Sequence, residues 1–136
     1  ARAEQAANRH LELSPTNLAA LNQLGTLAYL KQDWTTADAR YSEVLAKEPG
    51  AESTRLNRAM ANLRAGRLDR AREDYLLLAE KNPKVPAIQY GLGEIAEKQG
   101  RTADAFQHFS SYLANAPRGT SEYSNVVERA EKLKAR

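Results

Sequence analysis

The sequence predicts an all-α fold, built as an array of repeated helix pairs. Prolines recur at a fixed interval of 34 residues, at positions 15, 49, 83 and 117. Ala and Leu are abundant whereas Val, Ile and Thr are comparatively few, and this mixture favours helix over sheet. A period of about 20–50 residues is the signature of a repeat architecture, so we expect a solenoid of helices.

Several classes of side chain keep the same interval of 34 residues. Because each class repeats independently of the prolines, chance is a poor explanation for their agreement. The small residues are Gly25, Ala59 and Gly93, then Ala37, Ala71 and Ala105; the larger ones are Tyr41, Tyr75 and Phe109, then Val44, Leu78 and Tyr112.

Each repeat is predicted to hold two helices and a tight turn. In the first repeat the helices span about 18–30 and 35–47, and the turn spans 31–33. The later turns contain Gly66 and Gly100, and glycine suits a left-handed helix cap. The proline after each second helix cannot continue that helix.

The small residues allow helices to approach closely. Gly25 lies in the middle of a first helix and Ala37 near the start of the following second helix. Tyr41 follows Ala37 by four residues and therefore shares its helical face. We expect this aromatic ring, and its equivalents, to fill the space between one helix pair and the next.

These residues resemble the tetratricopeptide repeat (TPR) family, over nearly the whole chain. The first repeat carries the pattern as Leu24-Gly25, Ala37, Tyr41 and Pro49. The third repeat carries it as Leu92-Gly93, Ala105, Phe109 and Pro117, whereas the second is looser, with Arg58-Ala59 in place of Leu-Gly. The resemblance implies an all-α, right-handed superhelical solenoid of helix-turn-helix repeats that ends in a capping helix.

The period divides residues 1–136 into one predicted TPR domain. Residues 1–15 correspond to the second helix of a truncated repeat, whose partner helix is missing. The full repeats span 18–51, 52–85 and 86–119, and residues 120–136 form the capping helix. Thr120 or Ser121 is expected to cap that helix. Its predicted apolar stripe consists of Tyr123, Val126, Val127, Ala130 and Leu133.

The resemblance also implies a concave groove lined by the first helices. Its expected residues are Asn22, Thr26, Tyr29 and Leu30 in the first repeat, Leu56, Met60, Leu63 and Arg64 in the second, and Tyr90, Glu94, Glu97 and Lys98 in the third. Leu56, Met60 and Leu63 have two interpretations. They form the apolar middle of the groove, or they pack against neighbouring helices.

The function implied by this groove is protein–protein interaction, with a peptide or protein as partner. The expected setting is a bacterial multiprotein assembly, such as one for the cell envelope, secretion, pili or exopolysaccharide. One TPR subset grips a carboxyl terminus with Lys and Asn side chains. Asn22, Thr26 and Leu30 depart from that pattern, which argues against this mode.

A cluster of six arginines offers an alternative function. Arg55, Arg58, Arg64, Arg67, Arg70 and Arg72 lie among the acidic residues Asp69, Glu73 and Asp74. One interpretation is a solvated helix surface with local ion pairs. The other is recognition of an acidic polymer or polysaccharide. Self-assembly through exposed repeat edges is a further alternative.

Catalysis, cofactors and metals are not expected. The chain has no cysteine, and spacing brings no partner close to either histidine, His10 or His108. No catalytic triad or phosphate-binding glycine loop is present. The net charge of +3 is too small to predict nucleic-acid binding. No transmembrane segment is visible, and the expected compartment is the cytoplasm or the periplasm.

Overall fold

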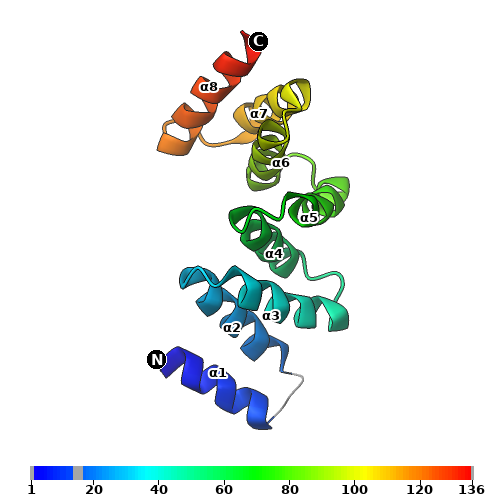
Figure 1. Cartoon of the computed structure of the whole chain (residues 1–136), viewed down its shortest axis with the longest axis vertical. Coiled ribbons are helices and arrows are strands. Elements are labelled where there is room, and N and C mark those ends of the chain that lie inside the picture. Colours follow the sequence, from blue (N-terminus) through cyan, green and yellow to red (C-terminus); the bar gives the residue numbers. More distant parts are fainter. Residues whose placement is uncertain (1, 14–16, 136) are drawn as a thin grey trace. The chain divides into compact units, whose positions relative to one another are not determined.

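A computed structural model describes residues 2–13 and 17–135, and helices joined by short turns are the only regular secondary structure there (Figure 1). The helices are α1 (Arg2–Leu13), α2 (Leu18–Leu30), α3 (Trp34–Lys47), α4 (Glu52–Arg64), α5 (Leu68–Lys81), α6 (Pro86–Lys98), α7 (Thr102–Asn115) and α8 (Ser121–Lys134). The predicted helix break at Pro15 and the predicted ends at residues 1 and 136 lie outside the described residues.

The predicted helices agree with the observed ones to within a residue in the first repeat. Helix α2 has the expected bounds, and α3 begins at Trp34, one residue before the expected start. Asp33 explains that start, because its carboxylate accepts a hydrogen bond from the Thr36 amide at 3.2 Å and caps the helix.

The turns inside the three full repeats share one backbone conformation. Gln32, Gly66 and Gly100 occupy equivalent positions, and their φ angles are 61°, 80° and 75°. The residue after each of them donates a backbone hydrogen bond of 2.9 Å to the carbonyl five residues earlier, as in a Schellman cap. The left-handed caps predicted from the glycines are therefore confirmed. The first repeat forms the same turn with glutamine.

The described chain forms two compact units, an N-terminal unit of residues 1–74 and a C-terminal unit of residues 75–136. In the N-terminal unit, α1 packs on α2, α2 on α3 and α3 on α4. In the C-terminal unit, α6 packs on α7 and α7 on α8. Helices that are neighbours in sequence therefore pack on each other, which is typical of a helical repeat.

Aromatic rings packed against glycine backbones hold the helix pairs together. A Cβ atom placed on Gly25 would lie 2.6 Å from Tyr41 Cε1, and one on Gly93 would lie 2.6 Å from Phe109 Cε1. Tyr41 also belongs to a buried cluster with Ala61 of α4, so it links its own pair to the next one, as predicted. In the C-terminal unit, Gly91 gives the same space to Tyr75 of α5.

The capping helix α8 packs by most of its predicted stripe. Thr120 caps it by accepting a hydrogen bond from the Tyr123 amide at 3.0 Å. Val126, Ala130 and Leu133 are buried and Tyr123 is half-buried. Val127 was wrongly included in the stripe, since it is 37% exposed. It is one residue past the buried Val126 and so lies about 100° around the helix from it.

We expect Gly25→Ala to destabilise the protein by about 1–3 kcal/mol, because the buried Tyr41 ring has to move to admit the new methyl group. Urea unfolding followed by circular dichroism measures the change. Gly50→Ala is the matched control, since nothing lies within 4 Å of a Cβ at Gly50. Equal stability of the two variants would show that the Tyr41 ring is not confined by Gly25.

Candidate partner-binding surface

The twelve predicted groove residues lie on α2, α4 and α6, the first helices of the three full repeats. Within each helix they are spaced as i, i+4, i+7 and i+8, which places them on one side. We call this side the first-helix face. It occurs on α2 and α4 in the N-terminal unit and on α6 in the C-terminal unit.

On α2 the polar groups of this face are used inside the fold. The Asn22 side-chain oxygen accepts a hydrogen bond from the Thr54 hydroxyl at 2.8 Å. The Thr26 hydroxyl lies 3.1 Å from the Tyr41 hydroxyl, at hydrogen-bonding distance. The face is therefore fixed in position by its own side chains, and a partner would have to compete for these groups.

The apolar residues of the face remain accessible in the N-terminal unit. Leu30 of α2 is 72% exposed. Tyr29 is half-buried and packs edge-on against Trp34, with ring centroids 5.0 Å apart. On α4, Leu56, Met60 and Leu63 are half-buried and Arg64 is exposed.

On α6 three predicted residues converge on one arginine of the capping helix. Arg129 Nε donates to Glu97 Oε1 at 3.0 Å, and its Nη1 donates to the Tyr90 hydroxyl at 3.2 Å. Glu94 Oε1 lies 3.7 Å from the same Nη1 atom. The fourth residue, Lys98, is exposed. Arg129 was not among the site residues predicted from the sequence, so this contact was missed.

A second set of contacts surrounds the buried carboxylate of Asp74, which is 3% exposed. Arg58 of α4 binds it through two hydrogen bonds of 2.8 Å, from Nε and Nη2. Arg55 adds a third at 2.9 Å. This bidentate pairing fixes the relative orientation of the two groups as well as pairing their charges. The hydrogen bonds to Asp74 also raise the pKa of Arg58.

Asp38 of α3 is the other buried carboxylate of this network. It accepts a hydrogen bond from Asn62 at 2.9 Å and forms an ion pair with Arg70 at 2.9 Å. Arg67 lies 3.9 Å from it and also donates to the Asn62 side chain at 3.2 Å. Asp38 was not among the acidic partners suggested by the sequence, because it lies 29 residues before Arg67 and outside that local segment.

Four of the six clustered arginines are thus bonded within the fold, namely Arg55, Arg58, Arg67 and Arg70. The second repeat needs them because its core departs from the pattern. Arg58 stands where the other repeats have Leu24 and Leu92, and Asn62 stands where they have alanine. A polar group in a core requires partners, and the two aspartates supply them.

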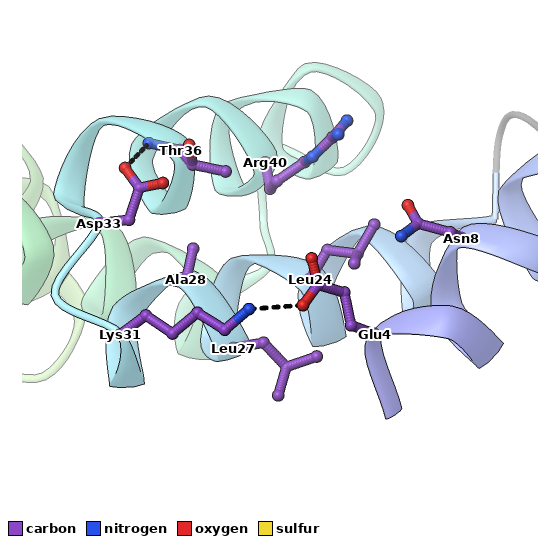
Figure 2. Close-up of a pocket in the computed structure, with 9 residues that line it drawn as sticks. All are labelled: Glu4, Asn8, Leu24, Leu27, Ala28, Lys31, Asp33, Thr36 and Arg40. Atoms are coloured by element: carbon purple, nitrogen blue, oxygen red, sulfur yellow. Dashed lines mark hydrogen bonds and ion pairs between the residues drawn. The ribbon is translucent and has the colours of Figure 1, made fainter. Parts of the chain in front are cut away.

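A pocket of about 110 Å³ lies over α2 in the N-terminal unit (Figure 2). Lys31 and Glu4 form an ion pair of 2.5 Å along one side, and Thr36 and Arg40 of α3 lie opposite. The residues that line this pocket lie 34 positions, or one period, before the residues around Asp38 and Asp74, which we call the aspartate network. Leu24 of the pocket corresponds to Arg58 of that network. The pocket of the first repeat is therefore equivalent to the site that the Arg58 side chain fills in the second repeat.

His108 was wrongly predicted to lack a partner. Its Nδ1 atom lies 2.9 Å from the side-chain oxygen of Gln89, on the neighbouring helix α6. Gln89 and His108 correspond, one period later, to Arg55 and Asp74, so the same polar contact recurs with different chemistry. In the part of the chain that the structure describes, no group of three potential metal ligands is assembled.

The family profile described as tetratricopeptide repeat matches residues 22–86 and, in an overlapping second match, 56–120. The chain belongs to the tetratricopeptide repeat family. Its sequence is 33% identical over 100 residues to human tetratricopeptide repeat protein 28, and 32% identical to the mouse protein. These matches cover 74% of this chain but only 4% of each relative.

Solved TPR structures have the same fold. The Arabidopsis OM64 TPR domain gives a TM-score of 0.76 at 21% identity, covering 85% of this chain and 94% of that one. The first TPR domain of Spaghetti (RPAP3), solved with an HSP90 peptide, gives 0.76 at 18% identity and covers 88% and 96%. TPR domains are protein–protein interaction modules and are typically non-catalytic. Among the described residues, no helix is both long and apolar enough to cross a membrane.

We expect Asp74→Asn to destabilise the protein by about 3 kcal/mol, because it leaves the half-buried Arg58 and Arg55 guanidinium groups without their carboxylate. Glu73→Gln removes the neighbouring exposed charge and should change stability by less than about 0.5 kcal/mol. Urea unfolding compares the two. A similar loss in both variants would mean that the network adds nothing beyond surface electrostatics.

Stability should also fall at alkaline pH because of Tyr112. Burial, together with its 2.6 Å hydrogen bond to Glu122, raises the pKa of Tyr112 to about 12. An unfolded tyrosine has a pKa of about 10. Between these values the unfolded chain loses the phenol proton and the native chain keeps it. The contribution of Tyr112 to the free energy of unfolding is therefore fully present below a pH of about 10 and is lost as the pH rises towards 12.

The variant Tyr112→Phe isolates this effect, since all other titrating groups are unchanged. Urea midpoints should fall further for the natural chain than for the variant when the pH is raised from about 9 to about 11. Identical pH dependence of the two proteins would contradict the raised pKa of Tyr112.

Proposed function

We propose that this chain is a protein-binding scaffold whose partner, a peptide or a protein, contacts the first-helix face. The observation that carries the proposal is the exposed apolar surface on that face. Leu30 is 72% exposed, and Leu56, Met60 and Leu63 are half-buried on α4. Leucine, methionine and tyrosine side chains suit adaptable recognition of an amphipathic helix or an extended peptide.

The polar side chains of α2 favour an apolar mode of binding. Asn22 and Thr26 are both within hydrogen-bonding distance of other side chains of the N-terminal unit. A partner that used them would have to break these contacts, and unmade buried hydrogen bonds are costly. The free energy of binding is therefore supplied by Leu30, Leu56 and Met60, with polar residues at the edges.

The proposed setting is a multiprotein assembly, and the bacterial, envelope-associated context predicted from the sequence remains part of this proposal. Solved TPR structures support the mode of action. Spaghetti (RPAP3) binds an HSP90 peptide through its first TPR domain, and the TPR2B domain of yeast Sti1 forms a complex with pHsp70. Binding rather than catalysis is thus the proposed role.

Recognition of an acidic polymer by the arginine cluster gains no support from the contacts. Four of the six guanidinium groups donate to or face Asp38 and Asp74, so they would have to exchange these carboxylates for the polymer. Steep salt dependence of binding would revive this function, because released counterions make polyanion binding sensitive to salt.

We expect the double variant Leu56→Glu/Met60→Glu to lose the natural partner, because two carboxylates on α4 would have to be desolvated on binding. The measurement is affinity capture from an extract of the source organism, read by mass spectrometry. Circular dichroism first verifies that the variant keeps its helices.

The matched control is Ala39→Glu/Ala46→Glu, which adds the same charge at two exposed positions of α3. A partner held by the natural chain and the control, but not by the double variant, supports the first-helix face. A partner held by all three proteins would move the binding surface elsewhere and contradict the proposal.

A further inference from the structure

We propose that Tyr90, Glu94 and Glu97 on α6 form an arginine-recognition site, which Arg129 fills in the free chain and an arginine of the partner takes over on binding. This inference rests on the proposed function, because it names the kind of side chain that one part of the first-helix face selects. The inferred site requires the partner to carry a basic residue. It differs in this from the TPR subset whose Lys and Asn side chains bind a carboxyl terminus.

The hydrogen bonds around Arg129 match the shape of a guanidinium group. Nε and Nη2 both donate to Glu97 Oε1, at 3.0 and 2.5 Å. Nη1 donates to the Tyr90 hydroxyl at 3.2 Å and lies 3.7 Å from Glu94 Oε1. All three nitrogen atoms of the guanidinium are therefore engaged. A lysine ammonium is a compact point charge and cannot span these acceptors at once.

Two aromatic rings complete the site. The central carbon of the Arg129 guanidinium lies 4.8 Å from the Phe109 ring centroid and 5.7 Å from that of Tyr90. Both distances are within the range of a cation–π contact. The rings do not depend on Arg129 for their position, because Phe109 is fully buried against Gly93 and Tyr90 packs on both Phe109 and Tyr112.

The charge of the site still favours a cation when Arg129 is in place. Glu94 and Glu97 each carry a negative charge and Arg129 a positive one, so the negative charge is in excess. The carboxylate side chains are 25% and 30% exposed, which leaves them open to an approaching guanidinium.

Arg129 can leave the site without unfolding the capping helix. Helix α8 is held by Val126, Ala130 and Leu133, which are buried in the core of the C-terminal unit. The positions one and two periods before Arg129 are Ile95 and Ala61, both fully buried and apolar. Helix packing at this position therefore needs no charge. The arginine matters for its guanidinium group, which occupies the acidic site.

The experiment compares three short peptides on the intact chain by NMR titration. They are acetylated and amidated Gly-Gly-X-Gly-Gly, in which X is arginine, lysine or citrulline, the neutral analogue of arginine. The variant Arg129→Gln keeps a polar side chain but removes the competing guanidinium. The arginine peptide should bind this variant more tightly than the natural chain, by about tenfold for a site that Arg129 fills about nine-tenths of the time.

Arg118→Gln is the matched control, since it removes the same charge from an exposed position before α8. It should bind the arginine peptide as the natural chain does. The lysine peptide should bind Arg129→Gln more weakly than the arginine peptide, and the citrulline peptide should not bind. Adding Glu97→Gln to Arg129→Gln should abolish binding of the arginine peptide.

Equal affinity of Arg129→Gln and the natural chain for the arginine peptide, or equal binding of the citrulline peptide, would overturn the inference. If Arg129→Gln fails to fold, the Arg129 Nε–H resonance of the natural chain decides. Its displacement by the arginine peptide alone supports the site, and no displacement refutes it. The affinity capture with the Leu56→Glu/Met60→Glu variant tests the proposed function separately. Failure of the arginine site and failure of the proposed function are therefore distinguishable.

Discussion

The contact between an aromatic ring and a bare glycine backbone is the constraint on which the helix pairs of the first and third repeats depend. Tyr41 on Gly25 and Phe109 on Gly93 fill space that any side chain on the first helix would occupy. Because the ring is buried between two helices, it fixes their separation and hence which side chains of the first helix face outwards. The positions of Thr26 and Tyr90 on the first-helix face follow directly, since each contacts one of these rings or its hydroxyl group.

The second repeat departs from this arrangement. An alanine, Ala59, replaces the glycine, and charged or polar residues replace core leucine and alanine. The resulting bonds between Arg58, Asp74, Asn62 and Asp38 leave no buried side-chain donor or acceptor unsatisfied among the described residues. Buried ion pairs contribute little net stability compared with apolar packing, but the bidentate pairing of Arg58 with Asp74 is specific for geometry. This repeat therefore gains precise positioning of α4, the helix that carries Leu56 and Met60.

The sequence predicted the helices, the left-handed turns and the family correctly, because packing positions such as Gly25 and Tyr41 repeat with the period and depend on local geometry. It missed contacts that join residues which do not repeat. Arg129 with Glu97, and Asp38 with Arg70, each pair residues 32 positions apart, and their residue types do not recur with the period. The partner-binding surface is of this second kind. Its position follows from the fold, but its chemistry follows from side chains that the repeat leaves free to vary.

The aspartate network has a consequence for the order of the repeats. Asp38 belongs to the first repeat, but its partners Asn62, Arg67 and Arg70 belong to the second. The third repeat has Ala96 and Asp104 where the second has Asn62 and Arg70. Placed directly after the first repeat, it would bring Asp104 towards the buried Asp38 and repel it. The repeats are thus not interchangeable, because the charges at each junction specify which repeat can follow. An array with the repeats in another order would place two carboxylates, those of Asp38 and Asp104, near each other at the junction.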